Sequence, residues 1–181
     1  MINLKIKSIH GKNIKLEPFS LDLVNNNYLN WMNDKDVSKF VSKAQGKTSL
    51  EDIYSFAKKM IESDSDYFFA ILHKKNNRHI GNVRLGQIDY ERMISNFGIL
   101  IGDQDFHGQG IGTEVLGLIK DFSFNYLKLN KLRFDVVKEN AAAMKLYAKS
   151  DFKCLGESKK KFKKDGISWK LVEWTMLNPN N

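Results

Sequence analysis

The sequence predicts an α+β fold in which helices flank a central, mostly antiparallel sheet. The 181 residues form strand-like and helix-like segments in groups, not in strict strand–helix alternation, which distinguishes α+β from α/β proteins. Hydrophobic residues make up 42% of the chain, enough for a sizeable core without disulfides or metals. No repeat or low-complexity tract interrupts it, and its prolines, Pro18 and Pro179, stand near its ends. We therefore expect one domain over residues 1–181.

The first part of the chain is predicted to form a strand pair and then helices. Residues 2–7 and 14–18 alternate apolar and polar side chains and are joined by the turn-like "HGKN". Ser20 is placed to cap a helix through "LDLVNNNYLNWM". Thr48 and Glu51 have the spacing of a capping box and predict a second helix through "LEDIYSFAKKMIES".

The remainder is predicted to supply most of the sheet and two further helices. Strand patterns occupy 67–73, 79–85, 94–101 and 132–137, helical patterns occupy 110–126 and 140–149, and two last strands surround 153–162 and 169–177. The "KDG" between the last two strands is a hairpin signal.

Charge and cysteine content narrow the class of protein. The formal net charge of +8 and the pI near 9.4 favour anionic partners, without choosing among nucleic acid, a membrane surface and a phosphorylated small molecule. The single cysteine, Cys154, cannot form an internal disulfide, which suits a reducing compartment. No stretch has the apolar length of a signal peptide or a membrane span. We expect a cytoplasmic protein with no membrane partner.

The segment "FHGQGIGTEVL", residues 106–116, carries glycine at 108, 110 and 112 between a predicted strand and a predicted helix. Glycine loses the most conformational freedom on folding, so this density needs a reason. The free N–H groups at a helix N-terminus bind phosphate, and glycine lets a diphosphate approach them. Two known phosphate loops do not fit, because Thr113 stands at the third glycine of the dinucleotide pattern and Val41 at the first glycine of a P-loop.

The pattern instead resembles the GNAT superfamily of N-acetyltransferases. Its coenzyme loop, Arg/Gln-x-x-Gly-x-Gly/Ala, is similar to "HGQGIG" at 107–112, with His107 in place of the usual Arg or Gln. Downstream, "ENAAAMKLYAKSDF" resembles the superfamily's Asn-x-x-Ala-x-x-Leu-Tyr segment, with Asn140 and Tyr147 in register. The region "YLNWMNDKDVSKFV" resembles the branch that acetylates ribosomal-protein N-termini.

The resemblance implies acetyl-CoA as co-substrate and a GNAT fold whose sheet strands splay at the coenzyme. The backbone amides from Gln109 to Thr113 are expected to hold the diphosphate, and an N–H near Leu100 to touch the acetyl oxygen. Gly98 is expected to mark the point where the strands part. The full coenzyme set implied is Leu100, Ile101, His107, Gly108, Gln109, Gly110, Ile111, Gly112, Thr113 and Asn140.

The resemblance also assigns catalytic roles. Tyr147 matches the tyrosine that protonates the departing thiolate, and a phenol is neutral at pH 7. Asn140 is expected to orient its helix or the coenzyme arm. Many relatives carry a glutamate as general base where this chain has Asn96, and a carboxamide cannot take up the amine's proton. Asp89, Glu91 and His79 remain candidates for that base.

The acceptor is less constrained by the sequence. Trp31 and Asn96 are the predicted acceptor-binding residues, and the basic tract at 158–164 either is a solvated hairpin or attracts an anionic group. The favoured function is direct transfer of acetyl from acetyl-CoA to a primary amine, without a metal, at a protein N-terminus. The alternatives are a nucleotide-linked amino sugar or other small amine, a non-catalytic acyl-CoA-binding protein, and a nucleic-acid-binding protein, although no nucleic-acid motif supports the last. A homodimer is left open.

Overall fold

The computed structural model describes residues 7–41 and 46–181. Most of the strand predicted over 2–7 therefore lies outside the described residues. The helices are α1 (Asn26–Asn33), α2 (Lys35–Ser38), α3 (Leu50–Ile61), α4 (Ile111–Asp121) and α5 (Ala141–Ala148). The strands are β1 (Ile9–His10), β2 (Ile14–Pro18), β3 (Tyr67–His73), β4 (His79–Asp89), β5 (Ile94–Ile101), β6 (Lys131–Val137), β7 (Lys153–Lys164) and β8 (Ile167–Leu177).

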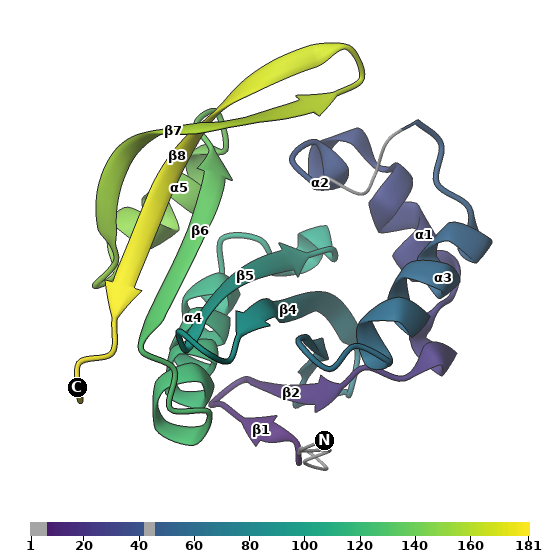
Figure 1. Ribbon diagram of the computed structural model, residues 1–181. Coiled ribbons are helices and arrows are strands. Elements are labelled where there is room, and N and C mark those ends of the chain that lie inside the picture. Colours follow the sequence, from purple (N-terminus) through teal and green to yellow (C-terminus); the bar gives the residue numbers. More distant parts are fainter. Residues whose placement is uncertain (1–6, 42–45) are drawn as a thin grey trace.

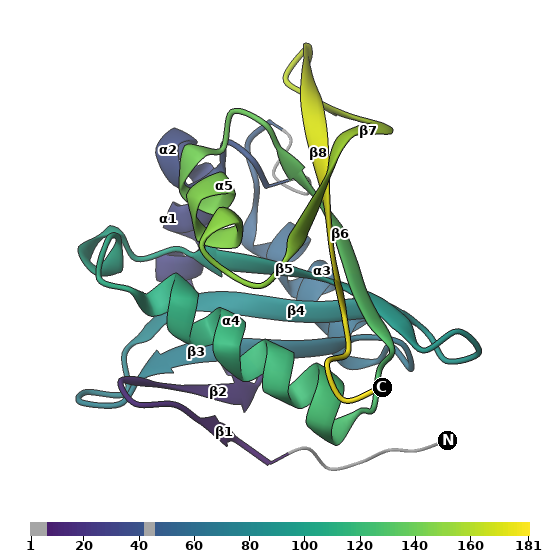
Figure 2. The ribbon, with the colours of Figure 1, turned by 90° about the vertical axis from the view of Figure 1, so that its left-hand side faces the viewer.

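The strands form one eight-stranded sheet in the order β1-β2-β3-β4-β5-β6-β8-β7. Each neighbouring pair is antiparallel except β5 and β6, which are parallel. Helices α1, α2 and α3 cover one face, and α4 and α5 cover the other (Figures 1 and 2). A hydrophobic cluster lies on each face of the sheet, the larger one against α4. The predicted α+β class is confirmed. No helix in the described ranges is long and apolar enough to cross a membrane.

The N-terminal helices begin at different residues from those that the sequence pattern predicts. Ser20 caps only a short 3₁₀ turn, and α1 begins later because the side chain of Asn25 accepts hydrogen bonds from the N–H groups of Asn27 and Tyr28. The capping box of α3 is formed by Ser49 and Asp52, so the prediction of Thr48 and Glu51 is wrong by one residue.

Thr48 is unavailable as a cap because Asn33 at the end of α1 holds its backbone. The Thr48 N–H donates to Asn33 Oδ1 at 2.9 Å, and Asn33 Nδ2 donates to the Thr48 carbonyl at 2.9 Å. The pair joins the end of α1 to the start of α3. The predicted helix over 110–126 is also two parts, since α4 gives way to a π-helical turn over Phe122–Tyr126.

Strands β5 and β6 part soon after they meet. They pair only at Ile94–Lys131 and Ser95–Leu132, although β5 continues to Ile101. From Asn96 onward, one edge of β5 has no strand partner in the described structure. This is the predicted splay, but the strands part after Ser95 and not at Gly98, which lies within the unpaired stretch with nothing within 4 Å of the position a Cβ would occupy. In Figure 1 the β6–β8–β7 group diverges from β5 above the point of contact.

The long β7–β8 hairpin reaches across to α2 (Figure 1). Lys164 Nζ donates to the Ser38 carbonyl at 2.5 Å, and the rings of Phe40 and Trp169 meet edge to face with centroids 5.5 Å apart. These contacts connect the hairpin tip to the opposite side of the splay. The hairpin and the N-terminal helices thus enclose the space that the parted strands leave.

Candidate active site

A cavity of about 520 Å³ lies at the splay. The side chains of β4 and β5 form its floor, α1 and α3 supply an apolar wall, and β6, α5 and the hairpin complete it. The wall includes Met32 of α1 and Ile53 and Phe56 of α3, and Phe68 of β3 lies beside them. Of the residues that the sequence predicts, Leu100, Asn96, Asn140 and Tyr147 all line this cavity.

Tyr147 is held rigidly at the cavity. Its side chain is 5% exposed, and its ring lies against an aromatic cluster of Phe97, Phe134, Phe152 and Trp174. Burial raises the pKa of Tyr147 above its ordinary value near 10, so the phenol keeps its proton throughout the neutral range. A protonated phenol in this position is suited to donate to a leaving group.

Asn140 begins α5, the helix that carries Tyr147. Its Oδ1 accepts a hydrogen bond from the Ala143 N–H at 3.1 Å, so it acts as the N-cap of that helix. The side chain therefore positions the helix, as one of its two predicted roles requires.

The glycine loop turns sharply before α4. Gly108 and Gly110 have φ values of +74° and +80°, which other residues rarely adopt, and nothing lies within 4 Å of a Cβ built on either. Gly110 is the N-cap of α4 and offers no side chain to its first-turn N–H groups, those of Ile111, Gly112 and Thr113. No neighbouring protein atom requires these two glycines, and the space beside them is open to a ligand.

His107 and Gln109 brace this loop. His107 Nε2 donates to the Ile101 carbonyl at 2.8 Å, and Gln109 Nε2 donates to the Asp105 carbonyl at 2.5 Å. Both side chains are exposed, and the loop lies outside the lining of the main cavity. The contact of this loop with the coenzyme stays a prediction.

Replacing Gly110 with Ala is expected to weaken CoA binding about tenfold, since the methyl group enters the space beside the helix N-terminus and the left-handed backbone is strained. Isothermal titration with CoA measures this effect. Gly166→Ala is the matched control, because Gly166 has φ +76° and equally open surroundings but lies in the hairpin turn. Equal affinities of Gly110→Ala and the wild type would show that the loop is an ordinary turn.

The predicted general bases do not lie at the cavity. Asp89 Oδ1 accepts from the N–H groups of Glu91 and Arg92 in its own turn, and neither Asp89 nor Glu91 lines the cavity. Asn96 does line it, but its Nδ2 donates to Gln87 Oε1 at 2.6 Å.

Asp135 on β6 is a carboxylate at the cavity that sequence reasoning missed. It lines the cavity, its Oδ2 pairs with Lys160 Nζ at 2.7 Å, and its Oδ1 is buried without a hydrogen-bond partner in the part of the chain that the structure describes. Its strand gives no sequence signal, because Asp135 stands at a non-buried position between the buried Phe134 and Val136, where a solvated acid is ordinary.

Asn82 on β4 is a second polar residue that the sequence did not single out. It is 3% exposed, lines the cavity and lies opposite Leu100 in the β4–β5 ladder. His79 Nε2 donates to Asn82 Oδ1 at 2.9 Å, which leaves Asn82 Nδ2 without a partner among the described residues. Burial lowers the pKa of His79, so its ring is neutral at pH 7. His79 thus orients an amide at the cavity and does not line it.

Trp31 packs outside the main cavity. Its indole lies against Gly102, where a Cβ would come within 2.1 Å of the ring, and its centroid is 4.9 Å from that of His79. It lines a second, smaller cavity of about 190 Å³ together with Asp34 and Gln104. The structure does not bring Trp31 to the main cavity, and its contact with the acceptor stays a prediction.

Comparisons with known proteins identify the family and the fold. A family model described as "Acetyltransferase (GNAT) domain" matches residues 13–153. A probable N-acetyltransferase, YjcK of Bacillus subtilis, is 31% identical over 67% of this chain and 67% of its own length. Spermidine N(1)-acetyltransferase of Escherichia coli is 32% identical over 60% of this chain and 55% of its own. The solved structure of spermidine N-acetyltransferase from Vibrio cholerae, in complex with CoA and spermine, superposes with a TM-score of 0.81 at 21% identity, covering 92% of this chain and 96% of that one.

Proposed function

This chain belongs to the GNAT acetyltransferase family, and we propose that it transfers the acetyl group of acetyl-CoA directly to a primary amine at the β5–β6 splay. The chain therefore belongs to the class of acetyl-CoA-dependent N-acyltransferases. The observation that carries the proposal is that a buried phenol, a carboxylate and the unpaired edge of β5 face one cavity, next to an open glycine loop.

The proposed reaction proceeds in one attack. The carboxylate of Asp135 takes up the proton of the incoming ammonium group, directly or through water, and frees the nitrogen lone pair. The amine then attacks the thioester carbonyl, whose oxygen is stabilised by an N–H of β5 near Leu100. The C–N bond forms and the C–S bond breaks, the nitrogen of the new amide loses its second proton to solvent, and Tyr147 donates its proton to the CoA thiolate. Solvent returns the proton to Tyr147 and removes the one held by Asp135.

The rest of the site supports this order of events. The backbone from Gln109 to Thr113 holds the coenzyme diphosphate, and Asn140 fixes the helix that presents Tyr147. Asn82, oriented by His79, offers its free N–H group to the acceptor or to the acetyl oxygen. The resident co-substrate is acetyl-CoA, and no step requires a metal.

For the acceptor we favour a protein N-terminal amine. Its reference pKa near 8 leaves it partly neutral at pH 7, whereas a lysine amine near 10.4 needs a stronger base. The region "YLNWMNDKDVSKFV", which forms α1 and α2, supports this choice through its resemblance to the ribosomal-protein branch. A small amine such as a nucleotide-linked amino sugar is the second candidate, because the basic tract at 158–164 lies on the hairpin and attracts anionic groups. The exposed, lone Cys154 suits the cytoplasm.

Release of free thiol from acetyl-CoA tests the function. The full chain is incubated with acetyl-CoA and a panel of peptides with free N-termini, amino sugars, polyamines and amino acids. We expect release that depends on one class of amine. If acetyl-CoA binds and no amine in any class promotes release, the proposed enzyme is contradicted in favour of an acyl-CoA-binding protein.

A further inference from the structure

We propose that the acceptor amine carries an anionic group, a carboxylate or a phosphate, that the lysines of β7 bind at the rim of the cavity. The proposal rests on the proposed function and names the substrate class of the same site. It is carried by the position of the β7–β8 hairpin and by the pairing of the charges around the cavity.

The hairpin forms a defined wall of the cavity. Lys160, Lys161 and Phe162 line it, and both lysine side chains are exposed, so they stand at its rim. The hairpin tip is anchored to α2 by the contact of Lys164 with the Ser38 carbonyl and by the packing of Trp169 on Phe40. The lysines are therefore held at the cavity by packing and are not the end of a free hairpin.

Among the charged side chains that line the cavity, the two carboxylates are already engaged. Asp135 pairs with Lys160 at 2.7 Å. Asp52 caps α3, where its Oδ2 accepts from the Ser49 N–H at 2.8 Å and from its hydroxyl at 2.7 Å. Lys161 forms no ion pair within the described ranges. The rim therefore offers a cation without a partner.

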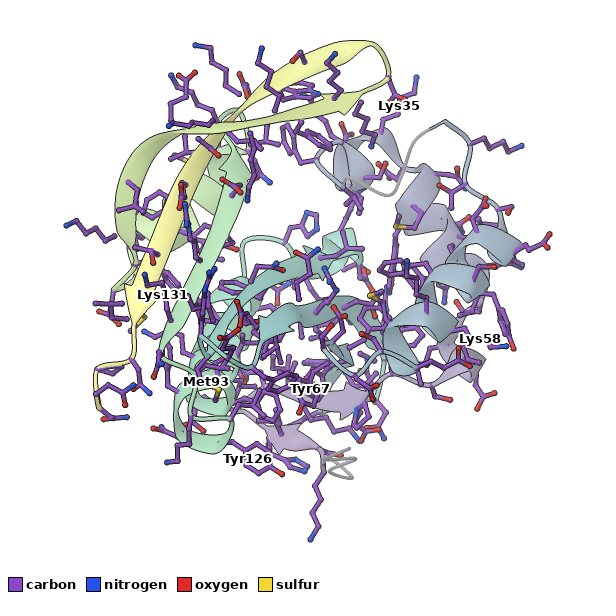
Figure 3. All side chains as sticks on the ribbon, viewed as in Figure 1. Lys35, Lys58, Tyr67, Met93, Tyr126 and Lys131 are labelled. Carbon is purple, nitrogen blue, oxygen red and sulfur yellow. The ribbon has the colours of Figure 1, made fainter. Side chains whose placement is uncertain are left out.

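Neighbouring lysines add to the positive charge at the rim. Lys159 and Lys163 lie on the same strand, and Nζ of Lys39, which follows α2, lies 5.4 and 5.5 Å from the ring centroids of Phe40 and Trp169. The nearby acid Glu157 pairs with Lys170. Figure 3 shows nitrogen-tipped side chains along the hairpin and Lys35 on α2 facing it. The summed field at this rim attracts anions and repels polycations.

A polyamine is a poor fit to this site. Holding a second or third ammonium group requires carboxylates that are free to pair with it, because an unpaired charge cannot be buried at low cost. The lining offers only Asp52 and Asp135, and one of them is needed as the base. The acceptor of this chain thus differs from the spermidine named for its Escherichia coli relative.

Acceptor kinetics with matched amines test the inference. Peptides of one length, each with the same first residue, carry Glu, Ala or Lys at the following positions. Glucosamine 6-phosphate with glucosamine forms a second matched pair, and spermidine is tested alone. We expect a lower KM for the anionic member of a pair, and which pair responds tells a carboxylate from a phosphate. Lys161→Glu is expected to raise that KM about fivefold, the size of an exposed ion pair, with little change in kcat or in KM for acetyl-CoA.

Lys58→Glu is the control, since it makes the same change of net charge on α3, away from the hairpin in Figure 3. It is expected to leave every KM unchanged. Three results would overturn the inference and leave the proposed acetyltransferase activity in place. They are equal KM values across each matched pair, a preference for spermidine, or a Lys161→Glu effect on the KM for acetyl-CoA instead of the KM for the acceptor. Absence of turnover with every amine would overturn the proposed function, and the inference with it.

Discussion

Replacing Tyr147 with Phe is expected to lower kcat about 100-fold, the usual contribution of a positioned general acid. The hydroxyl is the only group removed, and Phe retains the ring that packs against Phe97, Phe134 and Trp174. The affinity for acetyl-CoA is therefore expected to stay unchanged. Steady-state thiol release and CoA titration measure the two quantities on the same preparation.

The pH profile separates this role from a structural one. Because burial raises the pKa of Tyr147, the phenol stays protonated, and the wild-type kcat shows no loss from this residue below about pH 10. Tyr126→Phe, at an exposed tyrosine on the π-helical turn, is the control and is expected to leave kcat unchanged. A Tyr147→Phe enzyme with wild-type kcat would make this residue part of the aromatic core and nothing more.

Asp135→Asn is expected to lower kcat/KM about 10- to 100-fold at pH 7, because the carboxamide cannot accept the proton of the amine. The defect should shrink as pH rises towards the amine's own pKa, near 8 for an N-terminus, where the acceptor arrives already neutral. A pH series of kcat/KM from 6 to 9 with a good acceptor measures this convergence.

Glu173→Gln provides the control for Asp135. Glu173 lies opposite Asp135 in the β6–β8 ladder and pairs with Arg133, but it does not line the cavity. Its loss of one negative charge should leave kcat/KM unchanged. A defect in Asp135→Asn that stays constant across the pH series would assign Asp135 to holding Lys160 and the hairpin in place.

The sequence predicted the fold well where periodicity and turn chemistry coincide. The strands at 67–73 and 94–101 appear with the predicted bounds, and the glycine loop lies between the strand and helix that its pattern required. The splay was predicted by the resemblance and the short β5–β6 pairing confirms it, although the strands part after Ser95 and not at Gly98. Local sequence therefore determined most of the elements.

The misses arose where a tertiary contact decided between similar local choices. Thr48 and Ser49 are both good N-caps, and the bond from Asn33 to the Thr48 backbone leaves the role to Ser49. Asp135 could not be identified from its strand alone, since a single acid in a strand is usually solvated. Only the parting of β5 from β6 places it on a cavity with Tyr147.

The most direct test of the central claim follows the acetyl group itself. Acetyl-CoA labelled in the acetyl carbon is incubated with the enzyme and its best amine, and the label is traced by mass spectrometry to the amine, to acetate and to the protein. The account predicts one labelled amide for each thiol released, with no labelled enzyme. Label on the protein before the amine, or on acetate alone, would contradict direct attack at the β5–β6 splay.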